Sequence, residues 1–368
     1  MVLTPFFLTF KQTSNQHARK GSALFSQTDS YTKPLPTIMK NPFERDDYKF
    51  GAESFLIMFL NQYQFILGSD LENYINNDNL FNEKENPCNI YFILRRPKVT
   101  INPESVVIKG QEVSFELIIH NKDQKEIILM GLKFPEAKST LVFNSQYPYN
   151  LFSFSDGKDF LFVARPGSLI DYDIAENEYD IPSLDYEIMY IGQSYGKDGK
   201  RTALTRLSSH ETLQKIYTHT SSEHPNSDIW IMLTNFSQKS MLMTTGADFL
   251  KPNQENELDE YQKVSHFFKN NGLYFSEKQK INFTEAALIK YFKPKYNIEF
   301  KDSFPNPKHK SYSECYKLNV RAITIEINTD EMKRKIYTKS SEKKVKHMKM
   351  FEFNSDEDRI SLLGMNDL

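Results

Sequence analysis

Residues 190–210 read YIGQSYGKDGKRTALTRLSSH, and this stretch decides the fold prediction. The tripeptide Tyr-Ile-Gly at 190–192 closes the apolar run YEIMYIGQ, which predicts a strand. The glycines that follow indicate a loop, and residues 202–217 carry leucine and isoleucine at helical spacing. Arg206 and His210 are four residues apart, so one continuous helix would place both on the same face. This strand, loop and helix would bring together side chains that suit phosphodiester chemistry.

The composition is that of a folded globular protein. Of 368 residues, 39% are apolar, 26% are charged and 14% are aromatic. Two cysteines, Cys88 and Cys315, are too few for a disulfide framework and lack metal-ligand spacing, so we expect a reducing, cytoplasmic location. The N-terminus has no signal-peptide pattern. The apolar segment 54–68 is interrupted by Asn and Gln, which predicts a buried amphipathic helix and no membrane partner.

The chain is predicted to divide into four parts, with an α+β fold overall. The N-terminal arm is extended, the second part is a helix at 52–78 followed by an antiparallel, sandwich-like β-rich accessory domain, the third contains the Tyr-Ile-Gly strand, and the last is a basic strand pair with a tail. Their bounds are 1–50, 51–168, 169–305 with an insertion at 237–280, and 306–368.

Positive charge is concentrated toward the C-terminus. Residues 289–349 contain more than twice as many Lys and Arg as Asp and Glu, although the net charge of the whole chain is −2. Clustered cations indicate a polyanionic partner such as nucleic acid. The candidate backbone-binding cations are Lys197, Lys200 and Arg201 in the glycine loop and Lys343 and Lys344 near the C-terminus.

Two further residues complete a candidate catalytic set. Glu285 lies in NFTEAALIKYF, near the predicted start of a helix over 282–292, and Asn297 follows that helix in KPKYN. A carboxylate can hold Mg²⁺ or Mn²⁺, and Arg206 can bind two phosphate oxygens. A Tyr or His can transfer a proton if its surroundings adjust its pKa.

In order along the chain, these residues resemble the motifs of the GIY-YIG nuclease superfamily. The second signature tripeptide matches Tyr190-Ile191-Gly192, and the helical Arg followed by His matches Arg206 and His210. The metal-binding Glu and the following Lys-Pro-x-Tyr-Asn segment match Glu285 and 293–297. The match covers about residues 170–300, and only the ordered set of motifs is specific.

The resemblance implies a three-stranded antiparallel sheet flanked by helices and a role for each matched residue. Tyr190 would be the general base or its relay, with Gly192 giving the nucleic acid close access. Arg206 would bind the scissile phosphate, and His210 would assist proton transfer or contact the phosphate. Glu285 would be the ligand of Mg²⁺ or Mn²⁺, and Asn297 would support the site through hydrogen bonds.

The sequence departs from the family pattern in three ways. No Gly-Ile-Tyr tripeptide lies shortly before Tyr190, and Tyr172, Tyr179 and Tyr186 are the alternatives for its tyrosine. The loop before Arg206 is longer than usual, and so is the segment from His210 to Glu285. The missing tyrosine affects the proton-transfer chemistry more than the fold.

These observations predict a metal-dependent endonuclease that hydrolyses phosphodiester bonds in DNA. A restriction-like or anti-phage defence role is an analogy of architecture. A single site cuts one strand at a time, so a homodimer is one route to double-strand cleavage. The alternatives are a catalytically inactive GIY-YIG-like module that binds nucleic acid or protein, and a ribonuclease.

Overall fold

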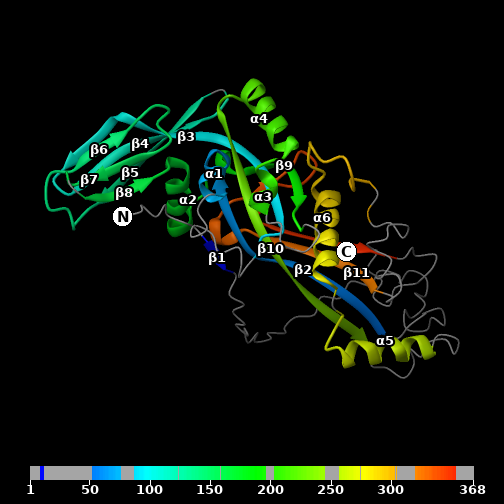
Figure 1. Cartoon of the computed structure of the whole chain (residues 1–368). Helices are drawn as coiled ribbons and strands as arrows, with labels where there is room; N and C mark the ends of the chain where they lie inside the picture. The colour runs from blue at the N-terminus through cyan, green and yellow to red at the C-terminus, as the bar shows by residue number, and fades with distance from the viewer. Residues whose placement is uncertain are drawn as a thin grey trace, which may run out of the picture.

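The computed structural model describes residues 9–11, 52–75, 87–122, 124–157, 159–195, 203–244, 257–273, 275–302, 304 and 320–353. Over these residues the chain is a mixed α/β protein in which strands predominate. A long, curled sheet crosses the molecule, a smaller sandwich projects from one end, and helix α5 (Glu257–Lys269) lies at the other (Figure 1).

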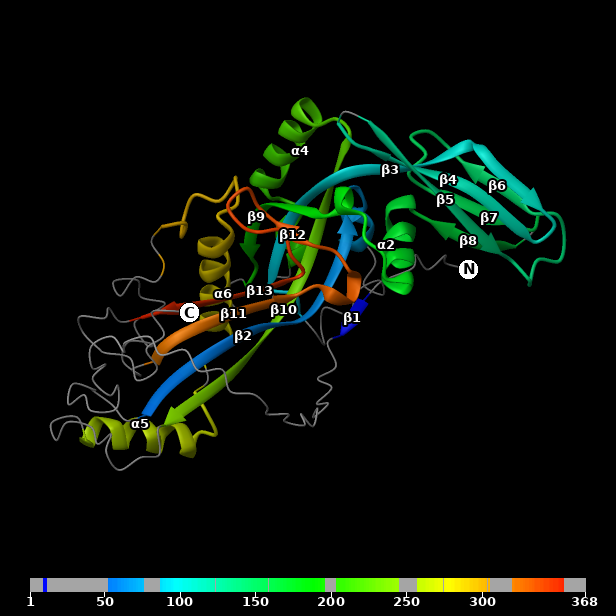
Figure 2. The same ribbon diagram turned by 180° about the vertical axis from the view of Figure 1, so that it is seen from behind.

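Seven strands of the main sheet pair in the order β12-β9-β3-β10-β2-β11-β13. Their bounds are β2 (Ala52–Leu67), β3 (Ile90–Lys109), β9 (Tyr186–Gln193), β10 (Ser227–Thr244), β11 (Val320–Asn328), β12 (Ile336–Tyr337) and β13 (Lys346–Glu352). A short strand, β1 (Thr9–Lys11), also pairs with β2. The β11–β2 and β12–β9 pairs are parallel, and the other pairs along this path are antiparallel. Figure 2 shows β2, β10 and β11 side by side.

The helix predicted at 52–78 is wrong. Of the residues described in this range, 52–67 form the interior strand β2, and Leu71–Ile75 form a short helix, α1, after a 3-10 turn at Gly68–Asp70. β2 is buried on both faces, since its side chains share one core with α6 and another with the helices of the opposite face. A strand buried on both faces lacks the apolar–polar alternation that identifies a strand with one face in water.

β3 belongs to both parts of the molecule. Its first half pairs with β9 and β10, and its second half pairs with β4 (Glu112–His120). The accessory sandwich places the sheet of β3, β4 and β5 (Lys125–Lys133) against a second sheet of three strands. These are β6 (Val142–Ser145), β7 (Phe152–Ser155) and β8 (Phe160–Ala164). The predicted domain boundary at 168 therefore assigns β3 and β9 to different domains, although these two strands pair with each other.

Helices cover both faces of the main sheet. One core contains α6 (Glu277–Phe292), and the opposite core contains residues of α1, α3 (Ala203–Leu207) and α4 (Glu211–Glu223). Helix α6 begins at Ser276, which forms a capping box with Gln279. Near the C-terminus β11 and β13 pair antiparallel, as the sequence predicts.

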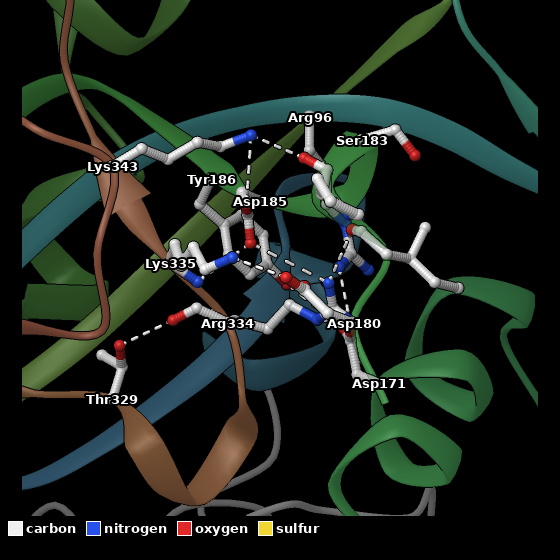
Figure 3. Close-up of polar contacts among 12 residues, drawn as sticks. Arg96, Asp171, Asp180, Ser183, Asp185, Tyr186, Thr329, Arg334, Lys335 and Lys343 are labelled. Atoms are coloured by element: carbon white, nitrogen blue, oxygen red, sulfur yellow. Dashed lines mark hydrogen bonds and ion pairs between the residues drawn. The ribbon is translucent and has the colours of Figure 1, made fainter. Parts of the chain in front are cut away.

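A buried ion cluster joins the sandwich to the main sheet (Figure 3). Arg96 of β3 donates to Asp171 of α2 (Pro166–Asn177), with Nη1 2.8 Å from Oδ1. The Arg96 guanidinium carbon also lies 4.2 Å from the ring centroid of Trp230 and 4.6 Å from that of Tyr186. Arg334 approaches the same Asp171 oxygen, with Nε at 3.3 Å. One carboxylate thus faces two fully buried guanidiniums.

We expect Asp171→Ala to destabilise the protein by about 3–5 kcal/mol, because it leaves Arg96 and Arg334 buried without their shared carboxylate. Urea unfolding measures this change. Glu112→Ala is the control, since Glu112 forms an exposed ion pair with Lys133 and should unfold close to wild type. Equal stability of the two variants would contradict the role given to the cluster.

Candidate active site

The site begins at the end of β9, where a tyrosine of β3 lies opposite a glycine. The register pairs Tyr91 with Gly192 and Ile93 with Tyr190. A Cβ atom on Gly192 would lie 2.6 Å from the Cζ and hydroxyl oxygen of Tyr91 and 2.7 Å from Cε1 of Tyr190. Glycine at 192 therefore lets the two tyrosine rings lie side by side, with centroids 6.3 Å apart.

Tyr91 is the residue that sequence reasoning missed. Tyr172 is an exposed residue of α2, Tyr179 donates to Asp173, and Tyr186 is buried near the other end of β9. Tyr91 alone among the four tyrosines lies opposite Gly192. The available signal was the tripeptide Asn-Ile-Tyr at 89–91, which begins a strand. This tripeptide lies far from Tyr190 in the sequence, because the whole sandwich is inserted between the starts of β3 and β9.

Arg206 and His210 reach the site from two helices. The single helix predicted over 202–217 is wrong, because α3 ends at Leu207 and α4 begins at Glu211. His210 is the N-cap of α4, and its Nδ1 accepts from the backbone N–H of Leu213 at 3.2 Å. Polar residues after Leu207 end the first helix, and a side-chain cap starts the second. The two residues therefore share no helical face.

Both side chains nevertheless converge on the tyrosines. Nε of Arg206 donates to the Tyr91 hydroxyl at 3.3 Å. The His210 ring lies 5.2 Å from the Tyr190 ring and 5.8 Å from the Tyr91 ring, measured between centroids. Because Nδ1 accepts a hydrogen bond, the neutral His210 ring carries its proton on Nε2. In this form His210 is a hydrogen-bond donor.

Glu285 lies in the middle of α6 rather than near its start, and it is only 8% exposed. Burial raises the pKa of its carboxyl to about 7, although the charge of Arg206 and hydrogen bonds from Gln193 lower it. The charge of Glu299 acts in the same direction as burial. The charged carboxylate is thus under-compensated, which favours the binding of a cation.

The phenols share this environment. Burial raises the pKa of Tyr91 and of Tyr190, and the Glu285 charge raises both further, while Arg206 opposes the shift. Both phenols therefore stay protonated at neutral pH. Tyr91 accepts from Arg206, so its own O–H proton can be offered to another acceptor.

Asn297 holds the strand that carries Tyr190. Its Oδ1 accepts from the Ile191 N–H at 2.9 Å, and its Nδ2 donates to the Ile191 carbonyl at 2.7 Å. Both polar groups of the residue between Tyr190 and Gly192 are satisfied by one side chain. Asn297 therefore positions the end of β9 and does not merely cap α6, whose C-cap is Lys293.

Of the predicted backbone-binding cations, the structure describes Lys343 and Lys344, which lie away from this site. Lys197, Lys200 and Arg201 lie outside the described residues. Lys343 pairs with Asp185 at 3.0 Å, and Lys344 pairs with Glu342 at 3.0 Å. These lysines lie near β12, which pairs with β9 at Tyr186. Tyr186 and Gly192 are six residues apart in an extended strand, which corresponds to roughly 20 Å.

The donor set fits a cation bound through few protein ligands. Among the residues that the structure describes, no cluster of three or more His, Cys, Asp or Glu side chains is arranged for a metal. Mg²⁺ is commonly held by one or two carboxylates, with water and phosphate as the other ligands. Glu285, buried and under-compensated, suits that mode of binding.

Comparison with protein-family models, curated proteins and solved structures gave no match. Within the described part of the chain, no helix is both long and apolar enough to cross a membrane.

We expect Gly192→Ala to destabilise the protein by roughly 1–3 kcal/mol, because the new Cβ forces Tyr91 or Tyr190 to move in a packed interior. Gly131→Ala is the matched control in β5, where the nearest atom to a new Cβ is the Val113 carbonyl oxygen at 3.8 Å. Urea unfolding of both variants checks this. Equal effects at the two positions would contradict the close packing inferred at Gly192.

The raised pKa of Glu285 predicts that the free energy of unfolding depends on pH. The folded protein holds this proton up to about pH 7, whereas the unfolded chain, in which the pKa of the carboxyl is 4.5, releases it at lower pH. The stability of the metal-free protein therefore falls as pH rises between these values. We expect Glu285→Gln to be more stable than wild type at pH 8, by up to about 3 kcal/mol, and similar to it below pH 4.5.

Unfolding free energies in EDTA from pH 4 to 8 measure this difference. Glu277→Gln, on the exposed first turn of the same helix, controls for loss of a carboxylate from α6. If the stability difference between Glu285→Gln and wild type does not change with pH, ionisation of the Glu285 carboxyl is not its cause.

Proposed function

We propose that the protein is a metal-dependent endonuclease of the GIY-YIG type that acts on DNA. The observation that carries the proposal is the convergence of a tyrosine pair, an arginine, a histidine and a buried carboxylate at one end of β9. These residues come from β3, β9, α3, α6 and the N-cap of α4, and a purely structural role does not require this combination of groups. They are Tyr91, Tyr190, Arg206, His210 and Glu285.

Tyr91 takes the place of the tyrosine that the family's first tripeptide supplies. It is the second residue of β3, and β3 lies between β9 and β10 as the centre of three antiparallel strands. In this chain Asn89 stands where the family has its first glycine. The cross-strand contact with Gly192 supports Tyr91 as this tyrosine, in place of the alternatives Tyr172, Tyr179 and Tyr186.

Each residue has a role that follows from its contacts. Arg206 would bind the scissile phosphate and offset charge that develops in the transition state. Tyr91 and His210 would donate hydrogen bonds to phosphate oxygens or to the leaving group. Tyr190 would relay the proton of the attacking water by accepting it while its own phenol proton passes to a phosphate oxygen. Glu285 would hold Mg²⁺ or Mn²⁺, which when bound lowers the pKa of water and stabilises negative charge on the phosphate.

The test is cleavage of supercoiled plasmid with Mg²⁺, Mn²⁺ or EDTA. We expect metal-dependent nicking that Glu285→Ala abolishes and Tyr91→Phe reduces by roughly 100-fold, since it removes one hydrogen-bond donor to the reacting group. Tyr179→Phe is the matched control, because its hydroxyl bonds to Asp173 away from the site. Nicked plasmid should accumulate before the linear form, since one site cuts one strand.

The same assay separates the competing functions. Intact duplex, single-stranded and branched DNA under all metal conditions would overturn the DNA endonuclease. Cleavage of RNA in a parallel reaction would reassign the substrate, and salt-dependent DNA binding without cleavage would indicate an inactive binding module. Loss of nicking in Tyr179→Phe but not in Tyr91→Phe would overturn the role given to Tyr91.

A further inference from the structure

The residue after Gly192 links β9 to the helix that carries Glu285. Nε2 of Gln193 donates to Oδ1 of Asn282 at 2.8 Å. Asn282 and Glu285 are three residues apart in α6, so both lie on the face of the helix that packs on β9. Gln193, the last residue of β9, thus links the strand of Tyr190 to the helix that carries the candidate metal ligand.

The Gln193 amide is suited to orient a carboxylate. An amide nitrogen carries two protons, and Asn282 accepts one of them. Gln193 also lowers the pKa of the Glu285 carboxyl through its side chain and its backbone N–H, which places it beside that carboxyl. Because Asn282 accepts one amide proton of Gln193, the second amide proton is available to Glu285.

We propose that Gln193 and Asn282 are positioning residues that fix the Glu285 carboxylate for cation binding. This inference rests on the proposed metal-dependent function. Groups that hydrogen-bond a metal ligand restrict its orientation, and their loss commonly weakens metal affinity by 10- to 100-fold. Asn282 acts one step further out, since it orients Gln193 and does not itself hold Glu285.

The proposal differs from a simple packing role in what it requires. If Gln193 only joined β9 to α6, its loss would lower the stability of the protein. Each molecule that remained folded would still bind the cation with wild-type affinity. A positioning role instead lowers cation affinity in the fully folded protein, while DNA affinity in EDTA stays unchanged because Arg206 is untouched.

The experiment measures Mn²⁺ binding by calorimetry on the full-length protein, with thermal unfolding and DNA binding in EDTA alongside. The main variant is Gln193→Met, which keeps the length of the side chain and removes both amide protons. The matched control is Gln238→Met in β10, where the amide donates to the Leu273 carbonyl at 2.6 Å away from the site. A second pair, Asn282→Asp and Asn282→Leu, retains or removes the acceptor for Gln193.

We expect Gln193→Met to bind Mn²⁺ at least about 10-fold more weakly than wild type, with Gln238→Met unaffected. Asn282→Leu should weaken binding and Asn282→Asp should restore most of it, which keeps the test informative if Gln193→Met does not fold. Wild-type affinity in Gln193→Met and Asn282→Leu, with binding lost in Glu285→Gln, would overturn the positioning role alone. No Mn²⁺ binding by wild type would overturn the metal site and this inference with it.

Discussion

The contact between Tyr91 and Gly192 is the constraint on which the arrangement of the site depends. Antiparallel register places these residues directly opposite each other, and the missing side chain at 192 makes room for the tyrosine ring. A shift of one residue in this pairing would turn every side chain of β9 to the other face. The positions of Tyr190, of Asn297 and of the α6 contacts all follow from that register.

The same strand connects the site to the accessory sandwich. β3 leaves the site at Tyr91, passes through the ion cluster at Arg96 and continues into the sandwich as one uninterrupted strand. A single extended strand bends easily, so the ion cluster is needed to restrain the sandwich relative to the main sheet. It joins α2, β9, β10 and the segment before β12 around two buried guanidiniums. The sandwich is thereby held in a defined orientation relative to the tyrosine pair.

Electrostatics at the site combine features that are unfavourable in the isolated protein. The carboxyl of Glu285 is buried in α6, and the charge of Glu299 adds to the cost of its ionisation, while the charge of Arg206 opposes that cost. These costs are accepted at functional sites, where a bound cation or anion removes them. The fold tolerates them because Asn297 and the β3–β9 ladder over-determine the local backbone.

How much the sequence predicts depends on the distance over which each signal acts. Local patterns correctly indicated the strand that carries Gly192, the helix that carries Glu285 and the pairing of β11 with β13. They failed for β2, whose burial on both faces removes the alternation of a strand, and for residues 202–217, where a cap at His210 divides the helix.

The identity of the site residues came from the order of local motifs, but their geometry did not. The sequence by itself determined that Tyr190, Arg206, His210, Glu285 and Asn297 form a chemically consistent set. Only the tertiary structure brought in Tyr91, since pairing between strands separated by a whole inserted sandwich leaves no local trace. Only the packing of α6 against β9 made Glu285 a buried carboxylate, because desolvation depends on neighbours that are distant in the chain.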